Sequence, residues 1–225
     1  MKQSKAIAAG FDEERPNSPG VDQNEYFATL ASAAPTPGGG SAAALVVALG
    51  ASLVAMVARI TQSGATYAAH SSLANELIVR SDELRVDALT ARIADEAAYR
   101  YVVAAMALPK TTADERAVRS GALQTALGGA AATPLSTARC ARDVAALARR
   151  ALAFENDALA SDLGCAAEFA SAGLAAAALN VRVNHRYMKD SAAIAAQSAE
   201  LERYEGEAGP LVTQVRCEVA RTLAR

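Results

Sequence analysis

The chain has 225 residues, 52% of them hydrophobic, and a formal net charge of −2 with both signs interspersed. This length allows one large domain or two small ones with a sizeable core, and the charge pattern argues against a nucleic-acid-binding face or a polybasic membrane patch. Alanine occupies 58 positions, and aromatic residues make up only 4%. Because alanine is the best helix former and a poor strand former, closely packed helices are predicted.

The N-terminal residues 1–21 are expected to form a flexible leader, and residues 22–225 a single helical domain. No apolar stretch precedes Asp12, so the leader does not have the pattern of a signal peptide. A capping box that begins at Asp22 predicts a short helix ending at Leu30.

The stretch PTPGGGSAAAL, residues 35–45, breaks this helix and opens a much more apolar one. Ser41 is predicted to cap a helix that runs to about Gln62. Its 17 uncharged residues, 42–58, predict a buried Ala/Gly-rich helix at the centre of a bundle. The alternative is a membrane helix at the short limit for a span of about 30 Å. The glycines favour either a tight turn between helices or a close approach to a ligand, with free N–H groups that suit an anion or a carbonyl oxygen.

A long helix is predicted over about 66–108, ended by Pro109, and its apolar stripe comprises Leu73, Leu77, Leu84, Ala88 and Ala91. The next step of four residues places Asp95 on this stripe, with Tyr99 one turn later. A core-facing acid must be paired, hydrogen-bonded or kept for chemistry. The alternatives are an acid/base group or an ion pair with an arginine of another helix. Glu96 is expected to be solvated.

The second half of the chain predicts further helices and no strand, so the expected fold class is all-α. A capping box at Thr112 opens a helix that Gly128 and Gly129 should end. Thr133 and Pro134 should open the next helix, which lasts to about Phe154. An alanine-rich helix from about Asp162 to Met188 follows. Asp190 should cap the last helix, which Gly209 and Pro210 should interrupt.

Several polar residues in these helices are candidates for binding. Asp162 lies at a predicted helix N-terminus, where capping alone would explain it. Asn180 and Asn184 continue a stripe of small residues, so they line either a ligand site or a polar clasp between helices. Arg182 occupies a neighbouring face of the helix, and its structural alternative is an ion pair. Lys110 follows a helix end, and its structural alternative is an interaction with the last helical carbonyls.

Cysteine and histidine offer little chemistry. Cys140, Cys165 and Cys217 are far apart and odd in number, which predicts reduced thiols in a cytoplasmic protein, without a zinc site or a disulfide framework. His70 and His185 are expected at the surface. No metal site is predicted.

Four segments occur in an order that resembles the cyclodeaminase/cyclohydrolase family: PTPGGGSAAAL, DEAAYRYVVAAMALPK, PLSTARC and SDLGCAAEFASAGLAAAALNVRVN. The resemblance covers roughly residues 22–222. It implies an all-helical dimer and an enzyme of folate one-carbon metabolism that acts on a tetrahydrofolate derivative without a metal or redox cofactor. The family motif falls on Pro35 to Ser41, Asp95, Lys110, Asp162, Asn180, Arg182 and Asn184. Glu96 stands where the family often has a small residue, which adds a second carboxylate.

The resemblance implies addition or elimination at the one-carbon bridge between N5 and N10, either cyclodeamination or cyclohydrolysis. Both need proton transfer, for which Asp95 or Asp162 is the candidate acid/base. The asparagines would orient the pterin, and Lys110 and Arg182 would hold the anionic glutamate tail. The full set of expected substrate-binding residues is Thr36, Gly38, Gly39, Gly40, Ser41, Tyr99, Lys110, Asn180, Arg182 and Asn184. The rival hypothesis is a non-catalytic helical oligomer or a membrane-associated protein; the primary one is a soluble homo-oligomer.

Overall fold

The computed structural model describes residues 23–225, except for the side chains of residues 65 and 66. The chain divides between residues 34 and 35 into two units. The described part of the first unit is α1 (Gln23–Leu30), whose end confirms the prediction. The predicted leader and the capping residue Asp22 lie outside the described residues.

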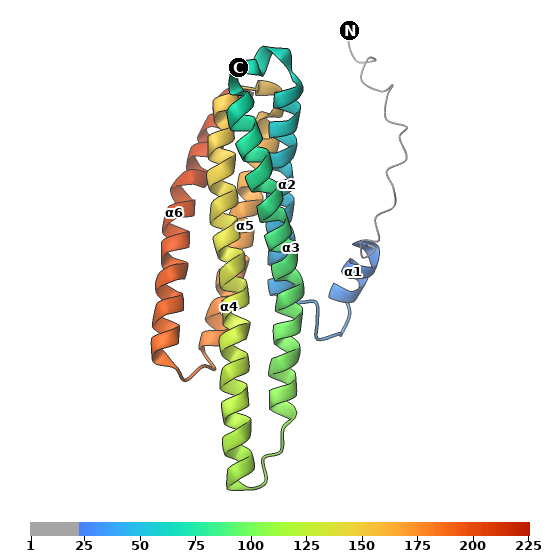
Figure 1. Ribbon diagram of the computed structural model, residues 1–225, viewed down its shortest axis with the longest axis vertical. Helices are drawn as coiled ribbons and strands as arrows, with labels where there is room; N and C mark the ends of the chain where they lie inside the picture. The colour runs from blue at the N-terminus through green and yellow to red at the C-terminus, as the bar shows by residue number, and fades with distance from the viewer. Residues whose placement is uncertain (1–22) are drawn as a thin grey trace. The chain divides into compact units, whose positions relative to one another are not determined.

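The second unit is a bundle of long helices joined by short connections (Figure 1). Its α-helices are α2 (Gly39–Ser63), α3 (Ser71–Ala107), α4 (Ala113–Ala151), α5 (Ala160–His185) and α6 (Ser191–Leu223). Short 3₁₀-helices are η1 (Ala65–His70), η2 (Leu152–Phe154) and η3 (Asp157–Leu159). The residues from 23 onward contain no strand, so the all-α prediction is confirmed.

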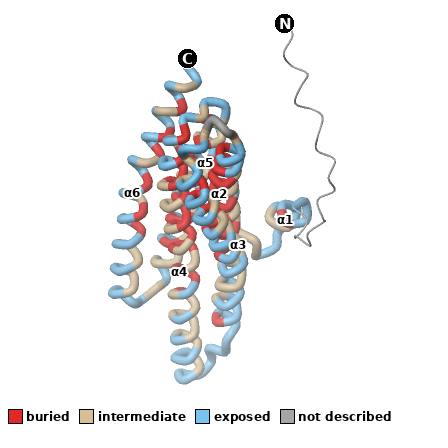
Figure 2. The backbone as a smooth tube through the Cα atoms, turned by 45° about the horizontal axis from the view of Figure 1, so that its top comes forward, coloured by how far each residue is buried: buried red, intermediate tan, exposed pale blue. Residues whose placement is uncertain are grey.

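Consecutive helices of the bundle, from α2 to α6, run in opposite directions (Figure 1). α2 packs against α3, α4 and α5, while α6 packs against α4 and α5. The ends of α3 and α4 continue past the other helices of the unit as a two-helix hairpin, drawn in green and yellow-green in Figure 1. Figure 2 shows the buried residues concentrated where helices face one another.

Small residues let the backbones of α2 and α5 approach closely. A Cβ atom added at Gly173 would overlap Val47 Cγ2 and lie 3.3 Å from the carbonyl oxygen of Ala43. A Cβ atom at Gly50 would lie 3.1 Å from the carbonyl oxygen of Ala166. At both positions a larger side chain would separate the helices, which explains the small-residue stripes in the sequence.

Two segments are long and apolar enough to cross a membrane by length and composition. They are α2, with a hydropathy of 2.3, and Asp157–His185, with 1.3; within the chain 61% and 44% of these windows are buried. Core helices of soluble proteins have the same composition, so this is weak evidence for a span. One face of α2 remains open, because Leu49 is 49% exposed and Ile60 is 47% exposed.

Three predicted boundaries are confirmed or corrected by the caps. Thr112 Oγ1 accepts a hydrogen bond from the Glu115 N–H at 3.1 Å, and the Glu115 carboxylate accepts one from the Thr112 N–H at 2.9 Å, so the capping box is confirmed. Asp190 caps α6 as predicted. The prediction for Ser41 is wrong, because the N-cap of α2 is Gly38, three residues earlier.

The predicted breaks at Gly128–Gly129 and at Gly209–Pro210 are also wrong, because α4 and α6 continue through them. Pro134 has no N–H and therefore leaves the carbonyl oxygen of Ala130 without its partner within α4. Asn184 of α5 supplies that partner: its Nδ2 donates to Ala130 O at 3.0 Å and to Asn180 O at 2.8 Å. The proline is thus accommodated by a polar clasp between α4 and α5.

This clasp predicts an energetic coupling between Pro134 and Asn184. Asn184→Ala leaves the buried Ala130 carbonyl unpaired and should lower the free energy of unfolding by about 1–3 kcal/mol. In a Pro134→Ala background the restored N–H satisfies this carbonyl, so we expect the same change to cost about 1 kcal/mol less. Urea unfolding of the wild type, both single variants and the double variant measures the coupling.

Gly128→Ala provides a matched background for this cycle. It also removes a weak helix former from α4, and its Cβ would meet nothing within 4 Å. In the Gly128→Ala background, Asn184→Ala should lower the free energy of unfolding by as much as it does in the wild type. Equal costs in all three backgrounds would show that Asn184 does not compensate for the proline.

Candidate active site

A cavity of about 530 Å³ lies within the second unit, between the glycine segment and helices α3, α4 and α5. It is lined by Pro35, Thr36, Gly38, Gly39, Gly40, Asp95, Tyr99, Val102, Met106, Leu123, Leu127, Ala130, Asn180, Val183, Asn184 and Tyr187. The wall is mostly apolar, with one carboxylate and two amides that converge near its glycine end. This composition is typical of a small-molecule site.

Asp95 of α3 caps the N-terminus of α2. The N-cap residue Gly38 has no side chain that could accept a hydrogen bond, and the backbone N–H of Ser41 donates to the Asp95 carboxylate instead. A Cβ atom at Gly40 would overlap Asp95 Oδ1 and lie 2.7 Å from Oδ2. Gly40 is therefore required for close approach of this carboxylate. Gly38 has a φ of −131°, so the segment does not turn through a left-handed conformation there.

Burial raises the pKa of Asp95 above its ordinary value of 3.8, and the charge of Glu96 raises it further. The hydrogen bond from the Ser41 N–H opposes both effects. No ion pair involving Asp95 is formed within residues 23–225. The alternative interpretation of Asp95 as half of an ion pair is therefore not supported, and the acid/base interpretation remains.

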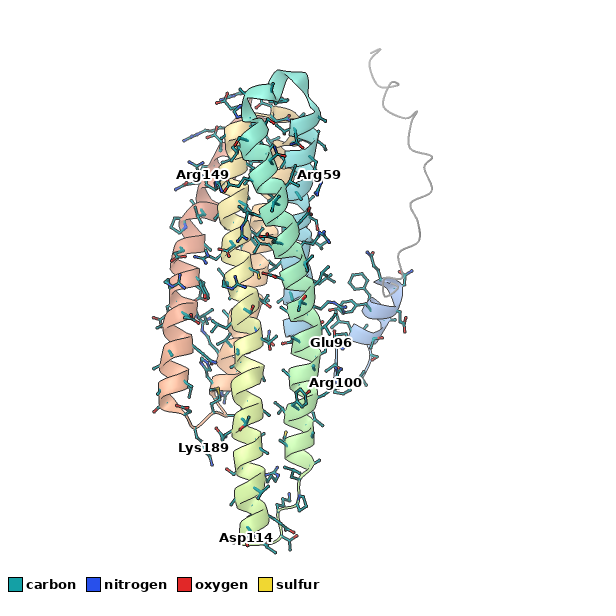
Figure 3. All side chains as sticks on the ribbon, viewed as in Figure 1. Arg59, Glu96, Arg100, Asp114, Arg149 and Lys189 are labelled. Atoms are coloured by element: carbon teal, nitrogen blue, oxygen red, sulfur yellow. The ribbon has the colours of Figure 1, made fainter. Side chains whose placement is uncertain are left out.

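Glu96 is half-buried and hydrogen-bonded, so the expectation that it is solvated is wrong. Ser41 Oγ donates to Glu96 Oε1 at 2.9 Å, and Arg92 pairs with the same oxygen at 3.4 Å. Figure 3 marks Glu96 on α3, at the level of the lower end of α2. This second carboxylate holds the first turn of α2 against α3 and leaves Asp95 to face the cavity.

Asn180, Asn184 and Tyr99 lie in the cavity wall. Asn180 Nδ2 donates to the carbonyl oxygen of Ala176 at 2.8 Å. Both bonds of the Asn184 amide nitrogen go to backbone carbonyls, and these acceptors fix which way its amide points. The Asn184 amide therefore offers a ligand its oxygen, an acceptor.

Four predicted site residues do not line this cavity, and one of them, Ser41, is fully buried. Arg182 is exposed and pairs with Glu205 of α6 at 2.7 Å, which is the structural alternative for it. Lys110 lies in the exposed loop at the tip of the α3–α4 hairpin. Asp162 lies in the first turn of α5, 18 residues before Asn180 and therefore about 27 Å away along the helix axis. Within one chain, Asp95 is the carboxylate at the cavity.

The sequence reasoning missed the apolar part of the wall: Val102, Met106, Leu123, Leu127, Val183 and Tyr187. The available signal was helical spacing, because Val183 and Tyr187 fall three and seven residues after Asn180. Cys140 is buried, and burial raises the pKa of its thiol to about 11, so it is no nucleophile. In the described part of the chain no group of three or more His, Cys, Asp or Glu side chains is placed to hold a metal ion.

The raised pKa of Asp95 predicts a pH-dependent stability difference. Folding favours the protonated carboxyl, so ionisation destabilises the protein progressively as pH rises from the unfolded pKa near 4 through the folded pKa. Asp95→Asn does not titrate and can still accept from the Ser41 N–H. We therefore expect the thermal midpoint of the variant, relative to wild type, to rise across this window and then level off. A relative midpoint that falls with pH would indicate a lowered pKa.

Comparisons with known proteins agree with this geometry. The model of the formiminotransferase-cyclodeaminase family matches residues 22–203. A methenyltetrahydrofolate cyclohydrolase from Methylorubrum extorquens is 42% identical over 81% of this chain and 88% of its own length. The formimidoyltransferase-cyclodeaminase of Rattus norvegicus is 34% identical over 68% of this chain, which spans 28% of that protein's length.

The fold has a solved counterpart. A crystal structure of formiminotetrahydrofolate cyclodeaminase from Thermotoga maritima is 26% identical, with a TM-score of 0.82 over 90% of this chain and 98% of that chain. The family model and the relatives confirm the resemblance that the four sequence segments indicated. The chain belongs to the formiminotransferase-cyclodeaminase family.

Proposed function

We propose that the chain is a folate one-carbon enzyme that acts at the bridge between N5 and N10 of tetrahydrofolate. The first candidate reaction is hydrolysis of 5,10-methenyltetrahydrofolate to 10-formyltetrahydrofolate, supported by the relative that is 42% identical. The observation that carries the proposal is the Asp95 carboxyl, held by the N-terminus of α2 in an otherwise apolar cavity with two amides.

The chemistry requires a group that moves protons. Water adds to the methenyl carbon, which carries delocalised positive charge, and gives a tetrahedral carbon. The bond from this carbon to N5 then breaks, and N5 takes up a proton. As a carboxylate, Asp95 stabilises the cation, accepts one proton of the attacking water and returns it to N5. The second proton, on the hydroxyl of the tetrahedral carbon, is lost to solvent as the formyl C=O forms. A carboxyl whose pKa is raised toward neutrality suits this exchange. The reaction itself calls for no redox step or cofactor.

The remaining wall residues bind the substrate. The oxygen of Asn184 accepts a hydrogen bond from an N–H group of the reduced pterin, and Asn180 lies one turn earlier on the same wall. Tyr99, Val102 and Leu127 pack against the flat rings. The glycine segment from Thr36 to Gly40 forms the wall beside the reacting carbon, where the lack of side chains lets the bridge approach Asp95.

The second candidate is cyclodeamination of 5-formiminotetrahydrofolate, in which N10 attacks the formimino carbon and ammonia leaves. It is favoured by the structural neighbour from Thermotoga maritima, which is a formiminotetrahydrofolate cyclodeaminase. Asp95 would then take the N10 proton and protonate the leaving ammonia. Parallel assays for loss of the methenyl chromophore and for ammonia release from the formimino substrate separate the candidates.

We also propose that the protein is a cytoplasmic homodimer. Its cysteines within the described part are free thiols, and two apolar faces are open. Leu49 and Ile60 of α2 are about half exposed, and Val79, Val86 and Ile93 follow at seven-residue spacing on α3 with 53–57% exposure. Exposed stripes of this kind are typical of subunit interfaces.

Light scattering tests this assembly. The wild type should have at least twice the chain mass of 23.1 kDa, and Leu49→Glu combined with Ile60→Glu should reduce it to a monomer, because two charges would be buried at the interface. Val118→Glu, at an apolar residue that is 67% exposed on the hairpin, is the control and should remain assembled. A monodisperse wild-type monomer, or extraction that needs detergent, would refute the proposal.

Asp95→Asn tests the catalytic assignment. The variant keeps the shape and the hydrogen bond to the Ser41 N–H but cannot carry a proton. We expect kcat to fall by about 10²–10⁴ with little change in folate affinity. Turnover by stopped-flow absorbance and folate binding by calorimetry are measured on one preparation. The control Asp162→Asn should keep wild-type turnover. If Asp162→Asn abolishes turnover and Asp95→Asn does not, the assignment is wrong.

A further inference from the structure

The cavity leaves the anionic end of a folate without a partner. Its wall contains no lysine, arginine or histidine, although the glutamate tail of a folate carries carboxylates at the end opposite the pterin. The wall extends along α3 from Asp95 to Met106, eleven residues or about 16 Å of helix. An elongated substrate with its reacting bridge at Asp95 must therefore present its tail at the Met106 end.

Two cations lie at that end. Arg119 of α4 is one turn before the wall residue Leu123, and its Nε donates to the carbonyl oxygen of Met106 at 3.1 Å. Lys189 follows the wall residue Tyr187, and its Nζ donates to Ser120 Oγ at 3.2 Å. Because Arg119 and Ser120 are consecutive, the two cations lie at the same level along α4. Figure 3 marks Lys189 beside α4, near the lower ends of α5 and α6.

Gln124 holds the Lys189 segment in place. Its Nε2 donates to the carbonyl oxygen of Tyr187 at 3.0 Å, and its Oε1 accepts from the backbone N–H of Lys189 at 2.6 Å. A single side chain of α4 thus fixes the connection between α5 and α6 on both sides. The backbone that carries Lys189 is therefore held in place by these two hydrogen bonds.

Neither cation is neutralised by a carboxylate. Within residues 23–225, Arg119 and Lys189 take part in no ion pair, whereas Arg182 and Arg142 each pair with glutamates of α6. The acids nearest in sequence are engaged elsewhere. Glu115 accepts from the backbone of Thr111 and Thr112, and Asp190 caps α6.

We propose that Arg119 and Lys189 bind the carboxylates of the substrate's glutamate tail, in the role that the sequence had suggested for Lys110 and Arg182. This inference rests on the proposed function. Arg119 offers a planar fork suited to a carboxylate, and Lys189 offers a second positive charge at the same level of α4. Since both are outside the cavity, they set the affinity for the tail and do not take part in proton transfer.

The test compares two substrates in Arg119→Gln and Lys189→Gln. One is 5,10-methenyltetrahydrofolate, and the other is the corresponding tetrahydropteroate derivative, which lacks the glutamate. With the folate, each variant should raise KM about three- to tenfold and leave kcat within about twofold, as expected for the loss of one solvent-exposed charge contact. With the pteroate derivative the variants and the wild type should have the same KM.

Lys110→Gln is the matched control, because it removes an exposed cation of the same hairpin that lies outside the cavity wall. It should leave KM unchanged for both substrates. Circular dichroism confirms that each variant is folded. Unchanged KM in both test variants with an active wild type, or an equal rise in Lys110→Gln, would overturn this inference alone. A wild type that turns over neither substrate, nor the formimino one, would overturn the proposed function as well.

Discussion

The contact between the Asp95 carboxylate and the first turn of α2 determines the arrangement of the candidate site. It supplies the cap that Gly38 lacks and brings α3 against α2 at the point where Gly40 leaves room. The same contact partly desolvates the carboxyl, which raises its pKa. The hydrogen bond from the Ser41 N–H opposes this rise in part, whereas the charge of Glu96 adds to it. Glu96 also accepts from Ser41 Oγ and so helps to hold the first turn of α2 in place.

The two ends of the cavity differ in polarity. At the glycine end the wall is short of side chains, and the few polar groups are fixed by backbone partners, as Asn184 is by Ala130. Toward Met106 the wall becomes apolar, and charge appears only outside it, at Arg119 and Lys189. A molecule with a polar head, a flat apolar middle and an anionic tail matches this gradient.

The sequence predicted the fold class and the inward position of Asp95 because both follow from helical periodicity. The prediction from sequence was wrong where a residue distant in sequence supplies a hydrogen bond that the local segment lacks. Gly128, Gly129 and Pro134 indicate helix ends by local rules, but α5 supplies the hydrogen bond that α4 lacks. The family motif predicts that Lys110 and Arg182 bind the substrate. In the structure Lys110 lies in the loop between α3 and α4, and Arg182 pairs with Glu205. Arg119 and Lys189 are 70 positions apart, and only the fold places both at the same level of α4.

The proline in α4 has a consequence for how this chain varies among relatives. While proline stands at position 134, the Ala130 carbonyl depends on a donor from residue 184, so the loss of Asn184 alone leaves that carbonyl unsatisfied. Proline at 134 should therefore occur together with a hydrogen-bond donor at 184 in relatives of this chain. Such paired inheritance would mark the contact between α4 and α5 in sequences whose structures have not been determined.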